Sequence, residues 1–128
     1  MKKLLVNAII TPDGTWLQSN HTHDYKSHQD KNGETYSVDG GLDYVRRSVN
    51  REPAANLCLF SDDPHEALRL HFCWGTRGKN GDENISWVPL YKLATEHIEK
   101  ILETQTHINS SVRKLFKDEL KYRKETHE

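Results

Sequence analysis

The side chains best suited to chemistry gather in one stretch, from His23-Asp24-Tyr25 through Asp39-Gly40-Gly41 to Arg46-Arg47. It combines imidazole, carboxylate and phenol groups with a Gly-Gly break and two adjacent arginines. Guanidinium groups bind phosphate through paired hydrogen bonds, so the arginines could clamp a phosphate while Asp43 reads ribose or base edges. The alternative is a solvated helix edge whose arginines pair with acidic side chains.

A second stretch, Trp74 to Asp82, interleaves glycines with an aromatic ring, basic groups and an amide. It lacks the Gly-Lys-Ser/Thr ending of a P-loop, and it does not match the dinucleotide-binding fingerprint. Its backbone N–H groups could still cradle an anion, with Arg77 and Lys79 adding charge and Trp74 a stacking face. The alternative is a tight hairpin held by glycines.

A third group, His21, His23, Asp24 and His28, carries donors that suit zinc or a related divalent ion. Alternate residues of a strand share a face, which would bring some of them together. Their spacing matches no specific zinc pattern. The alternative is structural: a buried, hydrogen-bonded His23–Asp24 pair that fixes the Asp39-Gly40-Gly41 bend.

The elements that must position these groups begin with a run of short strands. Segments rich in Leu, Val and Ile alternate with Pro-Asp-Gly and Asn-Gly turns. This pattern predicts an antiparallel meander over the first 40 residues. The expected strands are Lys3 to Ile10, Thr15 to Asn20, Thr22 to His28 and Glu34 to Val38, with turns at Thr11–Gly14 and Asp30–Gly33.

Beyond Gly40-Gly41 the pattern changes toward helix. We expect a short helix over Leu42–Val49, a buried strand over Ala55–Phe60, and a helix that starts at Ser61–Glu66 with an acidic cap and Pro64 in its first turn, running to about Leu70. A strand over Ile85–Leu90 precedes two amphipathic helices, Leu93–Thr104 and Asn109–Thr126. The last helix carries a basic ridge, defined as Arg113, Lys117 and Lys121.

The predicted fold class is therefore α+β, with an N-terminal antiparallel β-meander, a short central helix and two C-terminal amphipathic helices. The 128 residues predict a single domain, β-rich over 1–91 and helical over 92–126. An apolar fraction of 34% is lean, which favours burial against a second copy.

The totals also exclude some classes of function. A formal charge of −1 argues against a general polyanion binder. Cys58 and Cys73 sit inside apolar runs, which is typical of reduced core thiols in a cytosolic protein and gives nucleophilic catalysis little support. We expect no signal peptide, because Asn7 ends the first apolar run, and no stretch approaches the length of a membrane span.

Several motifs together resemble a widespread family of small phage and prophage proteins, and the resemblance covers nearly the whole chain. The matching residues are His23-Asp24-Tyr25, Val38 to Tyr44 with Arg46-Arg47, Ser61-Asp62-Asp63-Pro64, Trp74 to Asp82, His97-Ile98, and Asp118 to Leu120 with Tyr122-Arg123. Some members of that family carry cysteine pairs near Thr11–Gly14 and at His28–Asp30, which suggests a zinc knuckle there. This chain lacks those cysteines, and a Pro-Asp-Gly hairpin takes their place.

The architecture is also similar to that of the first Thoeris anti-defence family. This resemblance implies an oligomeric sponge that binds cyclic ADP-ribose-type signals, and sometimes cyclic oligonucleotides, without cleaving them. It implies a pocket near a subunit interface, built from an aromatic ring, an amide and helix arginines. By residue type, Trp74 or Trp87, Asn80, and Arg113 with Lys117 could fill those roles. Lys117 departs from arginine, which weakens any bidentate phosphate grip.

We therefore expect a non-enzymatic phage protein of the host cytoplasm, a homodimer or larger, that sequesters a small phosphorylated nucleotide signal. No cofactor is expected, and neither a membrane nor polymeric nucleic acid is an expected partner. The expected ligand-binding residues are Asp43, Arg46, Arg47, Trp74, Arg77, Lys79, Asn80, Trp87, Arg113 and Lys117. Two alternatives stay open: a metal-assisted phosphoesterase built on His21, His23, Asp24 and His28, and an inhibitor that blocks a host defence protein through the C-terminal helix pair.

Overall fold

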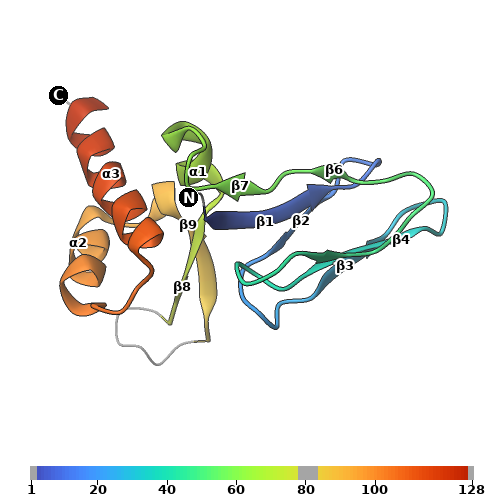
Figure 1. The fold of residues 1–128 in the computed structure, drawn as a ribbon, viewed down its shortest axis with the longest axis horizontal. Coiled ribbons are helices and arrows are strands. Elements are labelled where there is room, and N and C mark those ends of the chain that lie inside the picture. Colours follow the sequence, from blue (N-terminus) through green and yellow to red (C-terminus); the bar gives the residue numbers. More distant parts are fainter. Residues whose placement is uncertain (1–2, 78–83, 127–128) are drawn as a thin grey trace. The chain divides into compact units, whose positions relative to one another are not determined.

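The computed structural model describes residues 3–77 and 84–126 (Figure 1). It has the α+β class predicted from the sequence: antiparallel strands, a short central helix and two C-terminal helices. Backbone contacts divide the chain into two compact units, Lys2–Phe60 and Ser61–Glu128 together with Met1. Each unit is described below by itself.

The first unit opens with the hairpin of β1 (Leu4–Ile10) and β2 (Trp16–Ser19), in which Ile10 lies opposite Trp16. The predicted turn is confirmed: the Gly14 N–H donates to the Thr11 carbonyl at 2.9 Å. Gly14 has a φ of +89°, a conformation that favours glycine over every other residue.

A second antiparallel sheet contains β3 (Lys26–Gln29), β4 (Thr35–Asp39) and β5 (Arg46–Arg47), in that order. β3 is shorter than predicted, because residues 21–23 form a turn. The predicted helix over Leu42–Val49 is wrong: a turn follows Gly41, and Arg46 and Arg47 pair with Asp39 and Val38 of β4. The pairing with β4 stabilises extended backbone, whereas a helix of eight residues is marginal by itself.

The predicted buried strand over Ala55–Phe60 is also wrong in part. Two short strands, β6 (Ala55–Asn56) and β7 (Leu59–Phe60), pair separately with β1, and their residues are exposed or half-buried. The core of this unit is instead a cluster of Ile9, Leu17, Tyr36 and Val38 side chains, contributed by β1, β2 and β4.

The second unit combines three helices with one hairpin. Its elements are α1 (His65–His71), β8 (Cys73–Thr76), β9 (Ser86–Pro89), the 3₁₀ turn η1 (Leu90–Lys92), α2 (Thr95–Thr104) and α3 (Ser110–Thr126). α1 begins directly after Pro64, and no side-chain hydrogen bond caps it, so the predicted acidic cap is wrong.

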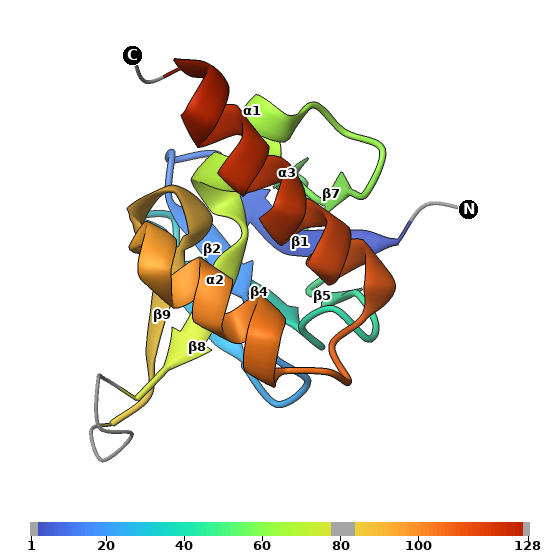
Figure 2. The same ribbon diagram turned by 90° about the vertical axis from the view of Figure 1, so that its left-hand side faces the viewer.

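Apolar faces of the helices meet in the core of the second unit. α2 and α3 run side by side (Figure 2). α2 contributes the buried side chains of Ile98 and Ile101, and the fully buried ring of Phe116 on α3 receives the edge of Phe72 at a centroid distance of 6.0 Å. Among the described residues, no helix has both the length and the apolar character that a membrane span requires.

Candidate functional site

Two buried polar side chains of the first unit hold the backbone around Gly40-Gly41 in place. Asn7 is wholly buried and donates from Nδ2 to the carbonyls of Asp39 and Gly41, each at 3.0 Å. The hydroxyl of Ser19, 1% exposed, accepts from the Gly41 N–H at 2.8 Å and donates to the Asp24 carbonyl at 2.6 Å. Asn7 of β1 and Ser19 of β2 thus fix the bend at Gly40-Gly41, which lies more than 20 residues further along the chain.

The two glycines at this bend are required by both conformation and space. Gly40 and Gly41 have φ angles of +99° and +56°. A Cβ on Gly40 would lie 2.1 Å from the Tyr44 carbonyl oxygen, and one on Gly41 would lie 2.3 Å from the His21 carbonyl carbon. Any side chain would push these segments apart, so the bend is fixed from both sides.

The predicted buried His23–Asp24 pair is wrong. His23 is exposed, while Asp24 accepts hydrogen bonds from the Asn20 N–H at 2.8 Å and the Lys26 ammonium at 2.9 Å. Support for the Gly40-Gly41 bend comes instead from Asn7 and Ser19. One sign of this role is visible in the sequence, because Asn7 is a polar residue within the apolar run of β1.

The structure does not assemble the histidine cluster that the metal-dependent alternative needs. His28 Nε2 lies 2.8 Å from Asp13 Oδ2 and 3.2 Å from the Thr15 hydroxyl, so the same nitrogen makes both contacts and cannot relay a proton between them. Hydrogen bonds from Thr11 and then from His28 lower the pKa of Asp13. Within residues 3–77 and 84–126, no three His, Cys, Asp or Glu side chains are grouped to hold a metal ion.

Arg46 and Arg47 follow one another in a strand, so their side chains leave β5 on opposite faces. Arg46 is exposed; its guanidinium lies 5.1 Å above the Tyr44 ring, and Nη1 is 3.8 Å from Asp39 Oδ2. Asp43 is also exposed and accepts a hydrogen bond from the Thr22 hydroxyl. Because the arginines diverge, the predicted clamp of both around one phosphate is not formed.

Arg47 turns the other way and becomes half-buried. Its Nη2 donates to Asn56 Oδ1 at 3.0 Å and to Cys58 Sγ at 2.9 Å. Its Nε is buried and has no hydrogen-bond acceptor. The ion pairs among the described residues do not include Arg47, so no carboxylate of this part of the chain neutralises its charge.

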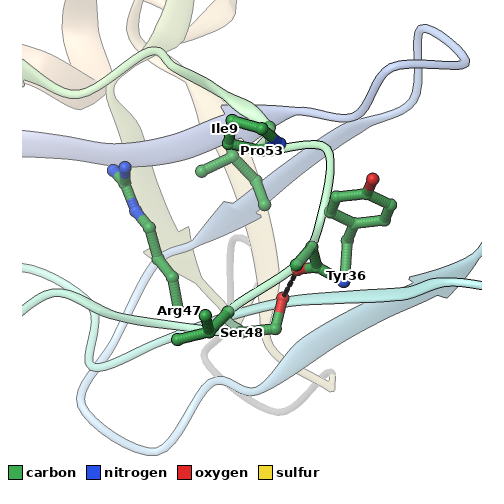
Figure 3. Close-up of a pocket in the computed structure, with 8 residues that line it drawn as sticks. Ile9, Tyr36, Arg47, Ser48 and Pro53 are labelled. Atoms are coloured by element: carbon green, nitrogen blue, oxygen red, sulfur yellow. Dashed lines mark hydrogen bonds between the residues drawn. The ribbon is translucent and has the colours of Figure 1, made fainter.

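Arg47 lines a hollow of about 290 Å³ in the first unit (Figure 3). Arg47 and Tyr36 stand on opposite sides of it, with Ile9 and Pro53 between them. The other lining residues are Ser48, Val49, Asn50 and Ala54. The walls are therefore largely apolar, with one cationic group at the side.

The neutral polar groups of the hollow already have partners within the protein. The Tyr36 hydroxyl donates to the Glu52 carbonyl at 2.6 Å, and the Ser48 hydroxyl donates to Asn50 Oδ1 at 2.6 Å, the dashed line in Figure 3. Asn50 Nδ2 donates to the Thr35 carbonyl at 2.8 Å. Among the buried side-chain nitrogen and oxygen atoms of the described residues, Arg47 Nε is the one without a hydrogen-bond partner.

In the described part of the glycine-rich stretch, the predicted stacking face of Trp74 packs within the protein. The alternative interpretation, a hairpin, is confirmed for its described flanks, where β8 pairs with β9. Trp74 packs its ring edge-on against Phe116 at 5.3 Å, and Trp87 lies opposite Gly75 in the hairpin. Arg77 is exposed. Two predicted contacts, Lys79 and Asn80, lie outside the described residues.

The basic ridge of α3 is also reduced. Arg113 donates from Nη1 to the Leu102 carbonyl at 3.2 Å and from Nη2 to the Gln105 carbonyl at 2.9 Å. These carbonyls close the C-terminal end of α2, so Arg113 caps that helix rather than presenting a free charge. Lys117 is exposed.

One charged cluster of the second unit was missed by sequence reasoning. The carboxylate of Glu119 is fully buried and receives hydrogen bonds from Arg69, Arg123 and His65. The distances are 2.9 and 3.0 Å for Arg69, 2.7 Å for Arg123 and 2.9 Å for His65. The signal was available, because Glu119 lies four residues after Leu115 on the apolar face of α3 and four before Arg123.

The Glu119 cluster is saturated with hydrogen bonds. Burial acts to raise the pKa of Glu119, but the hydrogen bonds from Arg69, Arg123 and His65 outweigh it and lower that pKa from 4.5 to about 2. Arg123 also donates to the Thr95 hydroxyl at 3.0 Å and the Leu90 carbonyl at 3.1 Å. The cluster therefore ties α1 and α3 to the segment before α2, and its groups are occupied.

Comparison of the chain with protein-family models, with curated proteins and with solved structures returns no match in any of the three.

Proposed function

We propose that this protein binds and sequesters a small phosphorylated nucleotide without cleaving it, using the hollow beside Arg47. One observation carries the proposal: Arg47 is a half-buried guanidinium with no carboxylate partner among the described residues and a buried, unpaired Nε, and it lines a largely apolar hollow. A buried donor without an acceptor costs about 1–3 kcal/mol. A phosphate oxygen would supply both the acceptor and the missing negative charge.

The chemistry of the hollow matches a compact ligand with one anionic end. Apolar side chains of Ile9, Pro53 and Ala54, with the ring of Tyr36, offer surface to a base or ribose. Its volume of about 290 Å³ is at the small end of ordinary ligand pockets, which favours one nucleotide unit over a polymer. Arg46 leaves β5 on the opposite face and does not line this hollow.

The biological setting proposed is phage counter-defence, in the host cytoplasm. Capture of a cyclic ADP-ribose-type or cyclic-nucleotide immune signal is what the resemblance to the first Thoeris anti-defence family implies. A self-assembled dimer or larger oligomer would bring further groups to the ligand.

Calorimetry of the purified protein against cyclic ADP-ribose isomers and cyclic di- and trinucleotides tests this function. We expect one member of the panel to bind with a Kd below about 1 μM, roughly −8 kcal/mol. The bound compound should be recovered intact after the complex is denatured. A cleaved product that appears only with added metal would favour the phosphoesterase. No binding by the panel, together with capture of one host defence protein, would favour the inhibitor.

A further inference from the structure

We propose that Asn56 and Cys58 hold Arg47 in a resting position, and that a phosphorylated ligand in the hollow draws the guanidinium away from them. The inference rests on the proposed function and adds how the site is regulated. The bonds of Arg47 to Asn56 and Cys58 both use Nη2. The rest of the guanidinium has no charged partner among the described residues.

The resting position is weakly bonded for a charged group. An amide oxygen and a thiol sulfur are neutral acceptors, and sulfur is a poor one. A phosphate oxygen adds a full negative charge, so its pairing with the guanidinium is ionic on both sides and can use two N–H groups at once. A phosphate that enters the hollow therefore competes favourably for the guanidinium.

Access also requires that Arg47 move. Its Nε is covered by protein, so a ligand cannot reach this atom while Nη2 stays on Asn56 and Cys58. Arg47 already lines the hollow, so rotation about its own side-chain bonds could bring the guanidinium to a ligand held there (Figure 3). The backbone of β5 can keep its pairing with β4 during this change.

The partners of the resting position are themselves fixed. Asn56 Oδ1 also accepts from the Cys58 N–H at 3.0 Å, which orients the amide toward Arg47. Cys58 Sγ lies 3.8 Å from Oδ1 of the wholly buried Asn7. A rigid resting place lowers the fraction of protein that is competent to bind, and it reduces the apparent affinity by the same factor.

Two substitutions at Asn56 test the inference in opposite directions. Asn56→Ala removes the neutral acceptor and releases Arg47, so affinity should rise by about threefold or more. Asn56→Asp supplies a carboxylate that pairs with the guanidinium, so affinity should fall by about tenfold or more. Asn32→Asp, at an exposed turn, is the control for the added charge, and its affinity should equal that of the wild type.

The probes are inorganic phosphate, which tests the anion contact alone, and cyclic ADP-ribose, each measured by calorimetry after circular dichroism has established that every variant is folded. If the wild type binds neither these probes nor any other member of the panel, the proposed function fails in this form. If the wild type binds but Asn56→Ala weakens binding or leaves it unchanged, the resting-position inference is overturned and the binding function stands. Equal affinity of Asn56→Asp and the wild type would overturn the inference in the same way.

Discussion

Arg47 of the first unit and the arginines around Glu119 in the second unit differ in whether a carboxylate pairs with them. In the second unit, Arg69 and Arg123 meet the fully buried Glu119, and His65 completes the set. In the first unit, Arg47 is half-buried with only an amide oxygen and a thiol as acceptors. Both regions remove guanidinium groups from water. Among the described residues, the Glu119 cluster neutralises its guanidinium groups with a carboxylate, whereas the surroundings of Arg47 do not.

The difference separates a structural role from a binding role. Taking a charge out of water is costly unless a counter-charge and hydrogen bonds compensate. The Glu119 cluster has that compensation, so a ligand has nothing to add there. The Arg47 site lacks it, and a small anion would supply it. Perturbed charges alone would have favoured Glu119 as the active centre; counting the partners of each group reverses that choice.

The largest effect should follow loss of the carboxylate in the saturated cluster. Glu119→Gln leaves the Arg69 and Arg123 charges half-buried and unneutralised, which should lower the free energy of unfolding by about 3–5 kcal/mol. Urea denaturation measures this change. Asp118→Asn is the matched control, because the neighbouring Asp118 side chain is 42% exposed and pairs with the largely exposed Lys114 at 2.8 Å; its effect should stay below about 1 kcal/mol. Similar losses in both variants would contradict the structural role of Glu119.

The same carboxylate should set the acid limb of stability. The pKa of Glu119 is about 2 in the folded protein and ordinarily 4.5, so the unfolded chain binds the proton more readily. Its contribution is fully present above pH 4.5 and is lost as the pH falls toward 2. Urea midpoints across this window should drop for the wild type, and Glu119→Gln should show a shallower drop. Parallel curves for the two proteins would refute the assignment.

The next effect concerns the bend that carries the arginines of the first unit. Gly41→Ala would place a methyl group 2.3 Å from the His21 backbone at a φ of +56°, so we expect a loss of about 2–3 kcal/mol. Gly33→Ala is the control: its φ is +82°, but nothing lies within 4 Å of the added carbon. Chemical denaturation of both variants separates the clash from conformational strain. Equal destabilisation would mean that the close approach of His21 contributes nothing.

The smallest change in stability should come from Arg47 itself. Arg47→Met removes an unneutralised charge and keeps an apolar side chain of similar length, so the free energy of unfolding should change by less than about 1 kcal/mol, or rise. Arg69→Met should cost about 3 kcal/mol, since it leaves the Glu119 carboxylate with fewer partners. Thermal and urea unfolding of the pair check this. A large loss for Arg47→Met would place Arg47 in the scaffold.

The sequence predicted the regular parts of the fold well. The first hairpin, the turn at Asp30–Gly33, β9 and the two C-terminal helices follow from local patterns, because turn residues and apolar periodicity act over a few neighbours. The predicted helix over Leu42–Val49 failed because strand pairing with β4, a contact between segments, decided the conformation. Local propensity does not contain that information.

The candidate site was only partly predictable. The sequence predicts that Arg47 and Arg46 bind one phosphate together, whereas the strand geometry of β5 sends the two side chains apart. The sequence predicts Arg113 as a ligand-binding residue of the basic ridge, whereas its guanidinium donates to the Leu102 and Gln105 carbonyls of the preceding helix and loop. The sequence shows that a residue is a hydrogen-bond donor. Which acceptors that donor meets depends on how distant segments come together in the fold.

A calorimetric titration of cyclic ADP-ribose into the wild type, Arg47→Met and Arg46→Met tests the central claim most directly. Arg47 is the unneutralised group at the hollow, whereas Arg46 is exposed and pairs loosely with Asp39. We predict that the wild type binds with a Kd below about 1 μM. Arg47→Met should lower the affinity by about 100-fold or more, which corresponds to about 3 kcal/mol, whereas Arg46→Met should lower it by less than about tenfold. Tight binding that survives Arg47→Met unchanged would contradict the account.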